Sequence, residues 1–256
     1  MKNEAENISR KYLNHDSKSP YLECSLLGLS LAEAKRILSF KWHSFESPDI
    51  YTKYNKTVYS LEHFKYDARK RNKNGSQQRR DEIKIKQSAD EKIRKEIKTE
   101  DYVTIHEEIK SVPKPEYYKD NFIKSFKLHY SKIDQYKENL SNKLGVDRES
   151  VAIWFIAEDE TIFGSSFCYD HDNSISRRPF FPLFFPEIEN LFIESKNLEG
   201  IISIIAENPY DKTLTLVKRN KHSVKELKKY HDYRGEPLFF LENPQAVMFA
   251  RKINVE

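Results

Sequence analysis

A continuous apolar run, Val151–Ala157 (VAIWFIA), constrains the fold of this chain more than any other segment. A short run without polar alternation is typical of a strand buried on both faces, because each face needs a covering layer. Strand-like and helical patterns precede this run. We therefore predict an α/β (α+β) fold in which a mixed central sheet is flanked by helices.

Three other patterns define the expected framework. Thr57–Asp67 and Tyr102–Val112 are rich in β-forming residues and predict strands. Apolar residues recur at helical spacing over Tyr117–Leu144, and Gly145 is expected to end that helix. Further expected elements are a helix over Leu31–Leu38, a turn at Ser47–Asp49, a strand over Glu82–Lys86, helices over Asp90–Lys98, Phe184–Ser195 and Ser223–Tyr230, and strands over Gly200–Ala206 and Thr213–Val217.

Composition bounds the class of protein. The 256 residues are 38% hydrophobic and 13% aromatic, which favours a packed core. The pattern predicts a core over 1–157 with a basic insertion at about 68–100, and a C-terminal extension over 158–256 packed on it as one composite domain. We expect no membrane span and no signal peptide, because no long apolar run exists. The two cysteines form no disulfide framework, so a cytoplasmic location is the default.

Positive charge is concentrated in one segment. The chain has a net charge of +4, but Lys65–Lys98 contains thirteen Lys and Arg against six Asp and Glu. Such an excess suits a polyanion such as nucleic acid, and it equally suits a solvated, charged helix or hairpin. The candidate phosphate-binding residues are Lys70, Arg71, Lys73, Arg79, Arg80 and Lys84.

A carboxylate and a lysine occur together in the second expected strand. Alternation puts Glu108 and Lys110 on one face, whereas Glu107 points away. A carboxylate beside an ammonium group can hold a divalent cation while the lysine stabilises phosphate charge. The same spacing is common in surface salt bridges, which is the alternative interpretation.

The order of these elements resembles a known family. Glu23 precedes the first helix, Asp67 ends one strand, Glu108-Ile-Lys110 lies on the next, and Gln135-Tyr136 lies on the long helix. Over roughly 22–157 this order is similar to that of the PD-(D/E)XK nuclease superfamily, including its bacterial nuclease-like members. The resemblance implies a restriction-endonuclease-like core with a C-terminal extension.

The resemblance also implies roles for individual residues. Asp67 and Glu108 would be metal ligands, with Glu23 as a further ligand, and Lys110 would be the catalytic lysine. Gln135 would contact phosphate or support the site. The implied cofactor is Mg²⁺ or Mn²⁺, because hard cations choose oxygen ligands.

Two further features, a proline–aspartate pair and a set of histidines, are not interpreted as metal ligands. Pro48-Asp49 is the family's literal proline–aspartate pair, but Asp49 is interpreted as a turn residue because no clear strand precedes it. His63, His106 and His129 fit no zinc signature and are interpreted as structural, with His63 and His106 as possible neighbours near the site.

The functional expectation is a metal-dependent nuclease that hydrolyses phosphodiester bonds in DNA, in a restriction, mobile-element or phage-defence setting known only by analogy. A homodimer or a partner subunit is compatible with it. The alternative is a catalytically inactive module of the same fold that binds nucleic acid or a protein. An unrelated α+β protein is the third interpretation. In the nuclease, the carboxylates of Asp67 and Glu108 should lie within about 5 Å of each other.

Overall fold

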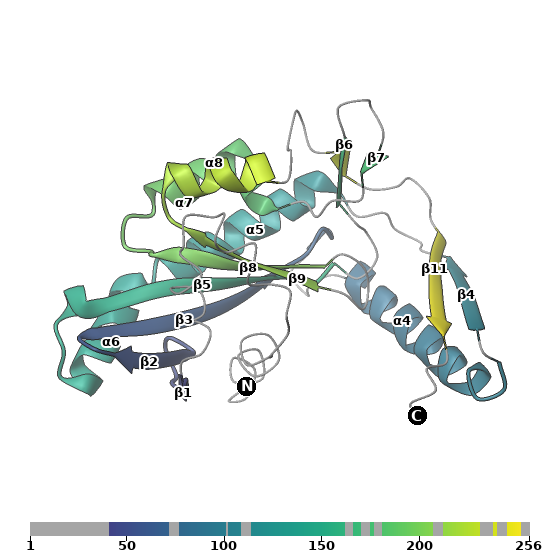
Figure 1. Cartoon of the computed structure of the whole chain (residues 1–256), viewed down its shortest axis with the longest axis horizontal. Helices are drawn as coiled ribbons and strands as arrows, with labels where there is room; N and C mark the ends of the chain where they lie inside the picture. Colours follow the sequence, from purple (N-terminus) through teal and green to yellow (C-terminus); the bar gives the residue numbers. More distant parts are fainter. Residues whose placement is uncertain are drawn as a thin grey trace.

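A six-stranded mixed sheet forms the centre of the computed structural model (Figure 1). The structure describes residues 41–71, 77–100, 102–108, 114–161, 166–169, 175–176, 181–206, 212–230, 238–239 and 245–251. The strands of the sheet are, in spatial order, β1 (His43–Ser44), β2 (Ile50–Tyr54), β3 (Thr57–Tyr66), β5 (Val151–Asp159), β8 (Gly200–Ala206) and β9 (Lys212–Lys218). The predicted α/β class with a mixed central sheet and flanking helices is confirmed.

The sheet combines two kinds of pairing. β1, β2 and β3 form an antiparallel meander, β3, β5 and β8 are parallel, and β9 returns antiparallel to β8. β5 is buried along nearly its whole length, as its apolar sequence predicts. The sheet contains strands from both sides of residue 157, where the expected core ends, and β5 itself continues to Asp159.

β2 is a strand that is not expected from the sequence. A two-residue turn, Asn55-Lys56, joins it to β3, and Asn55 has a positive φ of 55°. Asparagine tolerates this left-handed conformation better than most residues, so the turn suits a tight hairpin. The register of this hairpin matters for the site, because it sets which residues of the two strands face each other.

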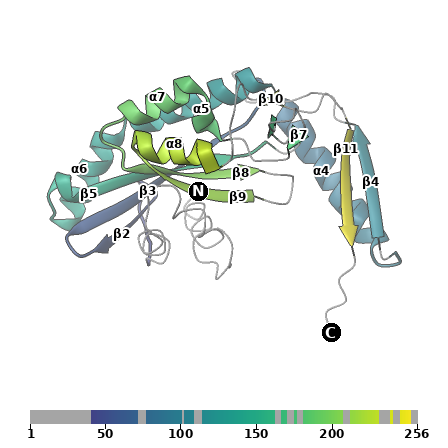
Figure 2. The same cartoon turned by 45° about the horizontal axis from the view of Figure 1, so that its top comes forward.

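Four helices pack against one face of the sheet (Figure 2). They are α5 (Pro115–Tyr130), α6 (Ile133–Leu144), α7 (Pro186–Glu194) and α8 (Lys221–Tyr230). Aromatic rings dominate the interface: Phe64 of β3 packs edge-on against Phe122 and Phe126 of α5 and against Phe155 of β5. Each such pair contributes roughly 0.5–1.5 kcal/mol of stability beyond the contribution of its buried area. These contacts therefore stabilise the packing of α5 against β3.

The expected single helix over 117–144 is wrong in one respect, because the structure has two helices there. α5 ends at Tyr130, and α6 begins at Ile133 after Ser131-Lys132. No proline or glycine marks the break, and the apolar spacing continues through it, which explains the incorrect prediction. The expected end of α6 is confirmed, since Gly145 adopts the left-handed conformation (φ 62°) and donates its N–H to the Ser141 carbonyl.

The charged segment is also different from the expectation. A single helix, α4 (Gln77–Glu96), replaces the strand predicted over Glu82–Lys86 and begins well before the predicted helix over Asp90–Lys98. Ile85, Ala89 and Ile93 recur every four positions and pack with Val103 and Ile105. Helical spacing therefore prevails over the local β preference of isoleucine.

The described part of the strand expected over Tyr102–Val112 lies outside the main sheet. It is observed as β4 (Tyr102–Glu108) and pairs antiparallel with β11 (Gln245–Arg251) near the other end of the chain. Both views show β4 and β11 beyond α4, on the side away from the six-stranded sheet (Figures 1 and 2). The remaining short strands, β6 (Ser166–Tyr169), β7 (Ile175–Ser176) and β10 (Leu238–Phe239), form a third sheet. No helix in the described part of the chain is both long and apolar enough to cross a membrane.

Candidate metal centre

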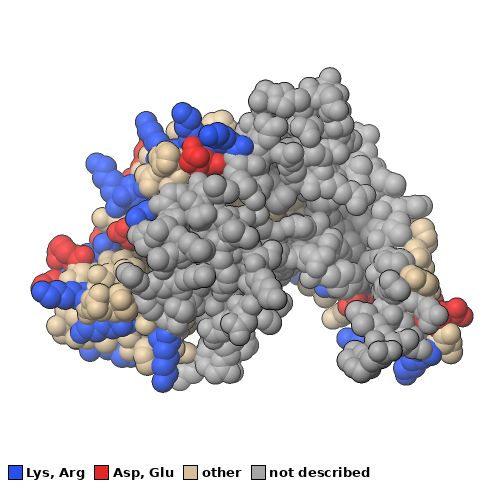
Figure 3. Space-filling view, viewed as in Figure 1, with Lys and Arg blue, Asp and Glu red and all other residues tan. Residues whose placement is uncertain are grey.

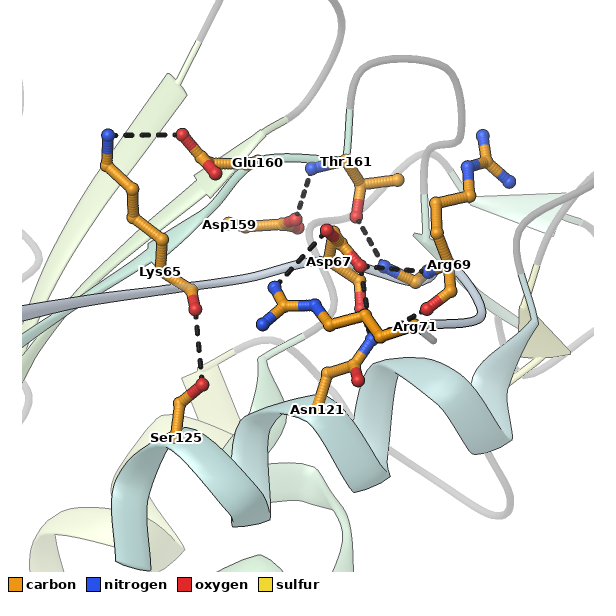
Figure 4. Close-up of polar contacts among 10 residues, drawn as sticks. Lys65, Asp67, Arg69, Arg71, Asn121, Ser125, Asp159, Glu160 and Thr161 are labelled. Atoms are coloured by element: carbon orange, nitrogen blue, oxygen red, sulfur yellow. Dashed lines mark hydrogen bonds and ion pairs between the residues drawn. The ribbon is translucent and has the colours of Figure 1, made fainter. Parts of the chain in front are cut away.

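Asp67 directly follows β3 and lies in a closed polar cluster (Figure 4). One carboxylate oxygen, Oδ1, accepts hydrogen bonds from the Arg69 backbone N–H and from Asn121 Nδ2, each at 3.1 Å. The other, Oδ2, accepts from Arg71 Nη2 at 3.2 Å. Asp67 is only 1% exposed. We call Asp67, Arg69, Arg71, Asn121 and their neighbour Asp159 the Asp67 cluster.

Asp159 joins this cluster because β3 and β5 are parallel and in register, with Tyr66 beside Asp159. Its carboxylate accepts the Thr161 N–H at 2.8 Å, and the Thr161 hydroxyl in turn accepts the Ala68 N–H. Burial, and then the charge of Asp159, raise the pKa of Tyr66. These contacts tie together the ends of two parallel strands.

A buried ion pair extends the cluster to α4. The Arg69 guanidinium contacts the Glu82 carboxylate, and both side chains are almost completely buried. Burial lowers the pKa of Arg69 to about 10, while the charges of Asp67 and Asp159 raise it. Because Arg69 pairs with Glu82 of α4 and Asn121 of α5 binds Asp67, the cluster is suited to holding β3, α5 and α4 together.

Of the other residues expected at the site, the structure places only Gln135 and the backbone of Glu108. Glu108 ends β4, which pairs with β11 in a separate two-stranded sheet, whereas Asp67 follows β3 of the six-stranded sheet. The side chain of Glu108 and all of Glu23 and Lys110 lie outside the described residues. Gln135 lies on the exposed side of α6.

The structure describes the side chains of four of the six expected phosphate-binding residues. Lys70, Arg80 and Lys84 are exposed, Arg71 is paired with Asp67, and Lys73 and the Arg79 side chain lie outside the described residues. On the face seen in Figure 3, Lys and Arg side chains also gather over α8. Basic surface is therefore not confined to the segment that the sequence highlights.

A second carboxylate site lies on the β2–β3 hairpin and was not predicted. The pairing of Ile50 with Leu61 puts Asp49 directly opposite Glu62 at the next position of the ladder. The Asp49 N–H donates to Glu62 Oε2 at 3.2 Å, and the His63 N–H donates to Asp49 Oδ2 at 2.8 Å. We call these two residues the Asp49–Glu62 pair.

Helices α5 and α6 hold this pair in place. Tyr136 donates its hydroxyl hydrogen to Glu62 Oε1 at 2.7 Å, and His129 Nδ1 lies 2.7 Å from the same oxygen. Asn139 donates to the Ser47 carbonyl in the turn that precedes β2. Burial and the negative charge of Glu62 raise the pKa of the Tyr136 hydroxyl, which therefore stays protonated and able to donate.

No lysine or arginine among the described residues neutralises the negative charge of the pair. Burial, and then the charge of Glu62, raise the pKa of Asp49. Among the described residues, the side-chain partners of Asp49 and Glu62 include histidine and tyrosine but no lysine or arginine. Like charges directly opposite each other destabilise a sheet, so a bound cation would reduce a repulsion that otherwise destabilises the fold.

The donor set fits a hard divalent cation. Asp49 Oδ1 accepts no hydrogen bond from the described residues, and Glu62 Oε2 accepts only one, so both oxygens keep lone pairs. Within the described part of the chain, no three His, Cys, Asp or Glu side chains form a complete metal-binding group. The pair would therefore need water or substrate oxygens as further ligands, an arrangement that Mg²⁺ favours.

A signal for this pair was present in the sequence. Asp49 follows Pro48, Ile50–Tyr54 alternates weakly, and Asn55-Lys56 has the character of a hairpin turn. If the residues from Asp49 to Glu62 form one hairpin with Asn55-Lys56 as its turn, Asp49 lies opposite Glu62. Asp49 does close a turn, since its carbonyl accepts the Phe45 N–H, but its carboxylate also faces β3.

Comparison with known proteins adds no further identification: no protein-family model, curated protein or solved structure matches this chain.

Proposed function

We propose that this protein is a metal-dependent nuclease that hydrolyses phosphodiester bonds in DNA, and that the Asp49–Glu62 pair holds its divalent cation. One observation carries the proposal. The partly buried carboxylate of Asp49 lies opposite the buried carboxylate of Glu62, and neither has a lysine or arginine partner among the described residues. The resemblance to the PD-(D/E)XK superfamily supports it, because the pair includes the literal Pro48-Asp49 dipeptide and contacts Tyr136.

The residues around the pair have defined tasks in this proposal. Asp49 and Glu62 supply the oxygen ligands, and Tyr136 and His129 fix the orientation of the Glu62 carboxylate. Ligand orientation by such partners typically changes metal affinity or activity by about 10–100-fold. Mg²⁺ or Mn²⁺ would neutralise phosphate charge and activate water. Exposed lysines and arginines of 65–98 would contact the phosphate backbone without reading sequence.

Cleavage assays test the proposal directly. Plasmid and linear DNA are incubated with Mg²⁺ or Mn²⁺ and the wild-type protein, Asp49→Asn or Glu62→Gln. Each substitution keeps the shape of the side chain and removes a ligand charge, so we expect cleavage to fall by more than about 100-fold. Glu138→Gln is the matched control, because Glu138 is an exposed carboxylate on α6, and this variant should cleave like the wild type.

Lys110→Ala tests the location of the site. Loss of cleavage in Lys110→Ala together with full activity in Glu62→Gln would place the chemistry at Glu108 and Lys110 and overturn the assignment to the pair. Tyr136→Phe should retain metal-dependent cleavage at a reduced rate, about tenfold lower, because it removes the hydroxyl that orients Glu62.

A second candidate function follows from Phe64. It occupies the position two residues after Glu62 on the same face of β3, where a Glu-x-Lys element would carry lysine, and its ring stacks on His129. This departure favours a catalytically inactive module that binds nucleic acid. Affinity for DNA that is salt-sensitive but independent of Mg²⁺, with no cleavage of any DNA substrate, would establish that function instead.

A further inference from the structure

Aromatic rings and one lysine form a surface beside the Asp49–Glu62 pair. The ring of His43 lies 5.5 Å from that of Tyr51, and Phe45 meets Tyr51 edge-on at 5.8 Å. The ammonium group of Lys143 lies 4.3 Å from the centre of the Phe45 ring and 5.6 Å from that of Tyr51. We call these four residues the Tyr51 surface.

The Tyr51 surface and the pair share one face of β2. Tyr51 is two residues after Asp49, so strand alternation puts both side chains on the same side, about 7 Å apart along the strand. Lys143 comes from α6, the helix that also supplies Tyr136 to Glu62. A ligand that reaches the pair from the edge of the sheet would therefore pass over these rings.

Parts of this surface are accessible. His43 and Lys143 are exposed, while Phe45 and Tyr51 are half-buried and also pack against the core. The ammonium group of Lys143 has no carboxylate partner among the described residues. Core packing explains the positions of Phe45 and Tyr51, whereas His43 and Lys143 contact these rings and remain exposed to solvent.

We propose that the Tyr51 surface binds single-stranded nucleic acid, with bases stacked on the rings and Lys143 on a phosphate. Aromatic side chains bind single strands because every base has an open π-face, whereas the bases of a duplex are already stacked. The inference deepens the proposed function. It rests on that function because it assumes that the bound strand is the one that is cleaved. It makes a single strand, or the frayed end of a duplex, the preferred substrate.

Binding without metal tests this inference separately from cleavage. The anisotropy of a fluorescently labelled oligo(dT) of about twelve nucleotides is titrated with the full chain in EDTA, beside a hairpin duplex and an oligo(U) of similar length. We expect tighter binding of the single strands than of the duplex. Comparison of oligo(dT) with oligo(U) identifies whether DNA or RNA is the preferred strand.

Substitutions assign the binding to the surface. Tyr51→Leu should weaken single-strand binding about tenfold, the loss of one stacked base, and Tyr51→Phe should retain it. Tyr54→Leu is the matched control, because Tyr54 belongs to the same strand but points to the other face. Lys143→Gln should lower the slope of log affinity against log salt by about 0.7, as expected for one phosphate contact.

The outcomes separate the two proposals. Equal binding of single strand and duplex, or wild-type binding by folded Tyr51→Leu and Lys143→Gln, would overturn the inference even if the protein cleaves DNA. Single-strand binding that Tyr51→Leu weakens, together with no cleavage under any metal condition, would support the inference and remove the proposed nuclease function. Circular dichroism of each variant confirms that the fold is intact.

Discussion

Two groups of carboxylates on or next to the same strand, β3, are built in opposite ways. In the Asp67 cluster, Arg71 pairs with Asp67, Arg69 pairs with the buried Glu82, and Asp67 is itself buried and hydrogen-bonded through both carboxylate oxygens. In the Asp49–Glu62 pair, two carboxylates face each other and their described side-chain partners include no lysine or arginine. The first arrangement has arginine partners and joins strands and helices, so we expect it to serve stability. The second would gain most from an external cation.

The largest effect on stability is expected at the buried ion pair of the Asp67 cluster. Arg69→Met removes the guanidinium and leaves the buried Glu82 carboxylate uncompensated. We expect the free energy of unfolding to fall by about 3–5 kcal/mol, measured by urea denaturation in EDTA. Arg80→Met, on the exposed side of the same helix as Glu82, is the control. An equal loss in both variants would show that the buried position of Arg69 contributes nothing extra.

A smaller loss is expected when Asp67 itself becomes neutral. Asp67→Asn keeps the shape of the side chain but removes the charge that Arg71 contacts and that raises the pKa of Arg69. Hydrogen bonds to charged groups contribute about 1.5–3 kcal/mol, so the unfolding free energy should fall by about that amount. The loss should be the same with and without Mg²⁺. Dependence of the loss on metal would assign the cation to Asp67.

The same substitution at Asp49 should have the opposite sign. In EDTA, Asp49→Asn removes one of two opposed like charges, and we expect a gain of roughly 0.2–1 kcal/mol in unfolding free energy at neutral pH. In saturating Mg²⁺ the wild type should gain stability that the Asp49→Asn variant does not share, because a ligand that binds only the folded state stabilises it. Destabilisation of Asp49→Asn in EDTA would mean that the pair is satisfied without metal.

The smallest effect concerns pH and the same variant. Burial and Glu62 raise the pKa of Asp49 above its ordinary value of 3.8, so the folded state favours the protonated carboxyl. The stabilising contribution of that preference is present below 3.8 and is lost as the pH rises through the folded-state pKa. The advantage of Asp49→Asn over the wild type in EDTA should therefore be absent below pH 3.8 and grow toward neutral pH. A pH-independent difference between the two unfolding curves would contradict this assignment.

Local patterns were sufficient to predict much of the framework. The apolar run of β5, the alternation of β3, the strand β8 and the glycine that ends α6 all depend on neighbouring residues, and all four are observed. The break between α5 and α6 was missed because neither proline nor glycine marks it. The full length of α4 was missed because its isoleucines favour a strand locally, whereas their spacing fits a helix that packs against β4.

The candidate site depended on information that is not local. Asp67 was chosen because it ends a strand, but only the structure shows that Arg71 and Asn121 already occupy its carboxylate. The role of Glu62 was not predicted, because the residue that it faces depends on the register of the β2–β3 hairpin. The partner of β4 lies near the other end of the chain, so no short pattern around Glu108 could have revealed that it leaves the main sheet.

The most direct test is calorimetric titration of Mn²⁺ into the wild type, Asp49→Asn, Glu62→Gln and Asp67→Asn, each shown to be folded by circular dichroism. The account predicts that the wild type and Asp67→Asn bind the cation and that the two variants of the pair lose this binding. Loss of binding in Asp67→Asn, with binding retained in Asp49→Asn and Glu62→Gln, would contradict it and return the metal site to the end of β3.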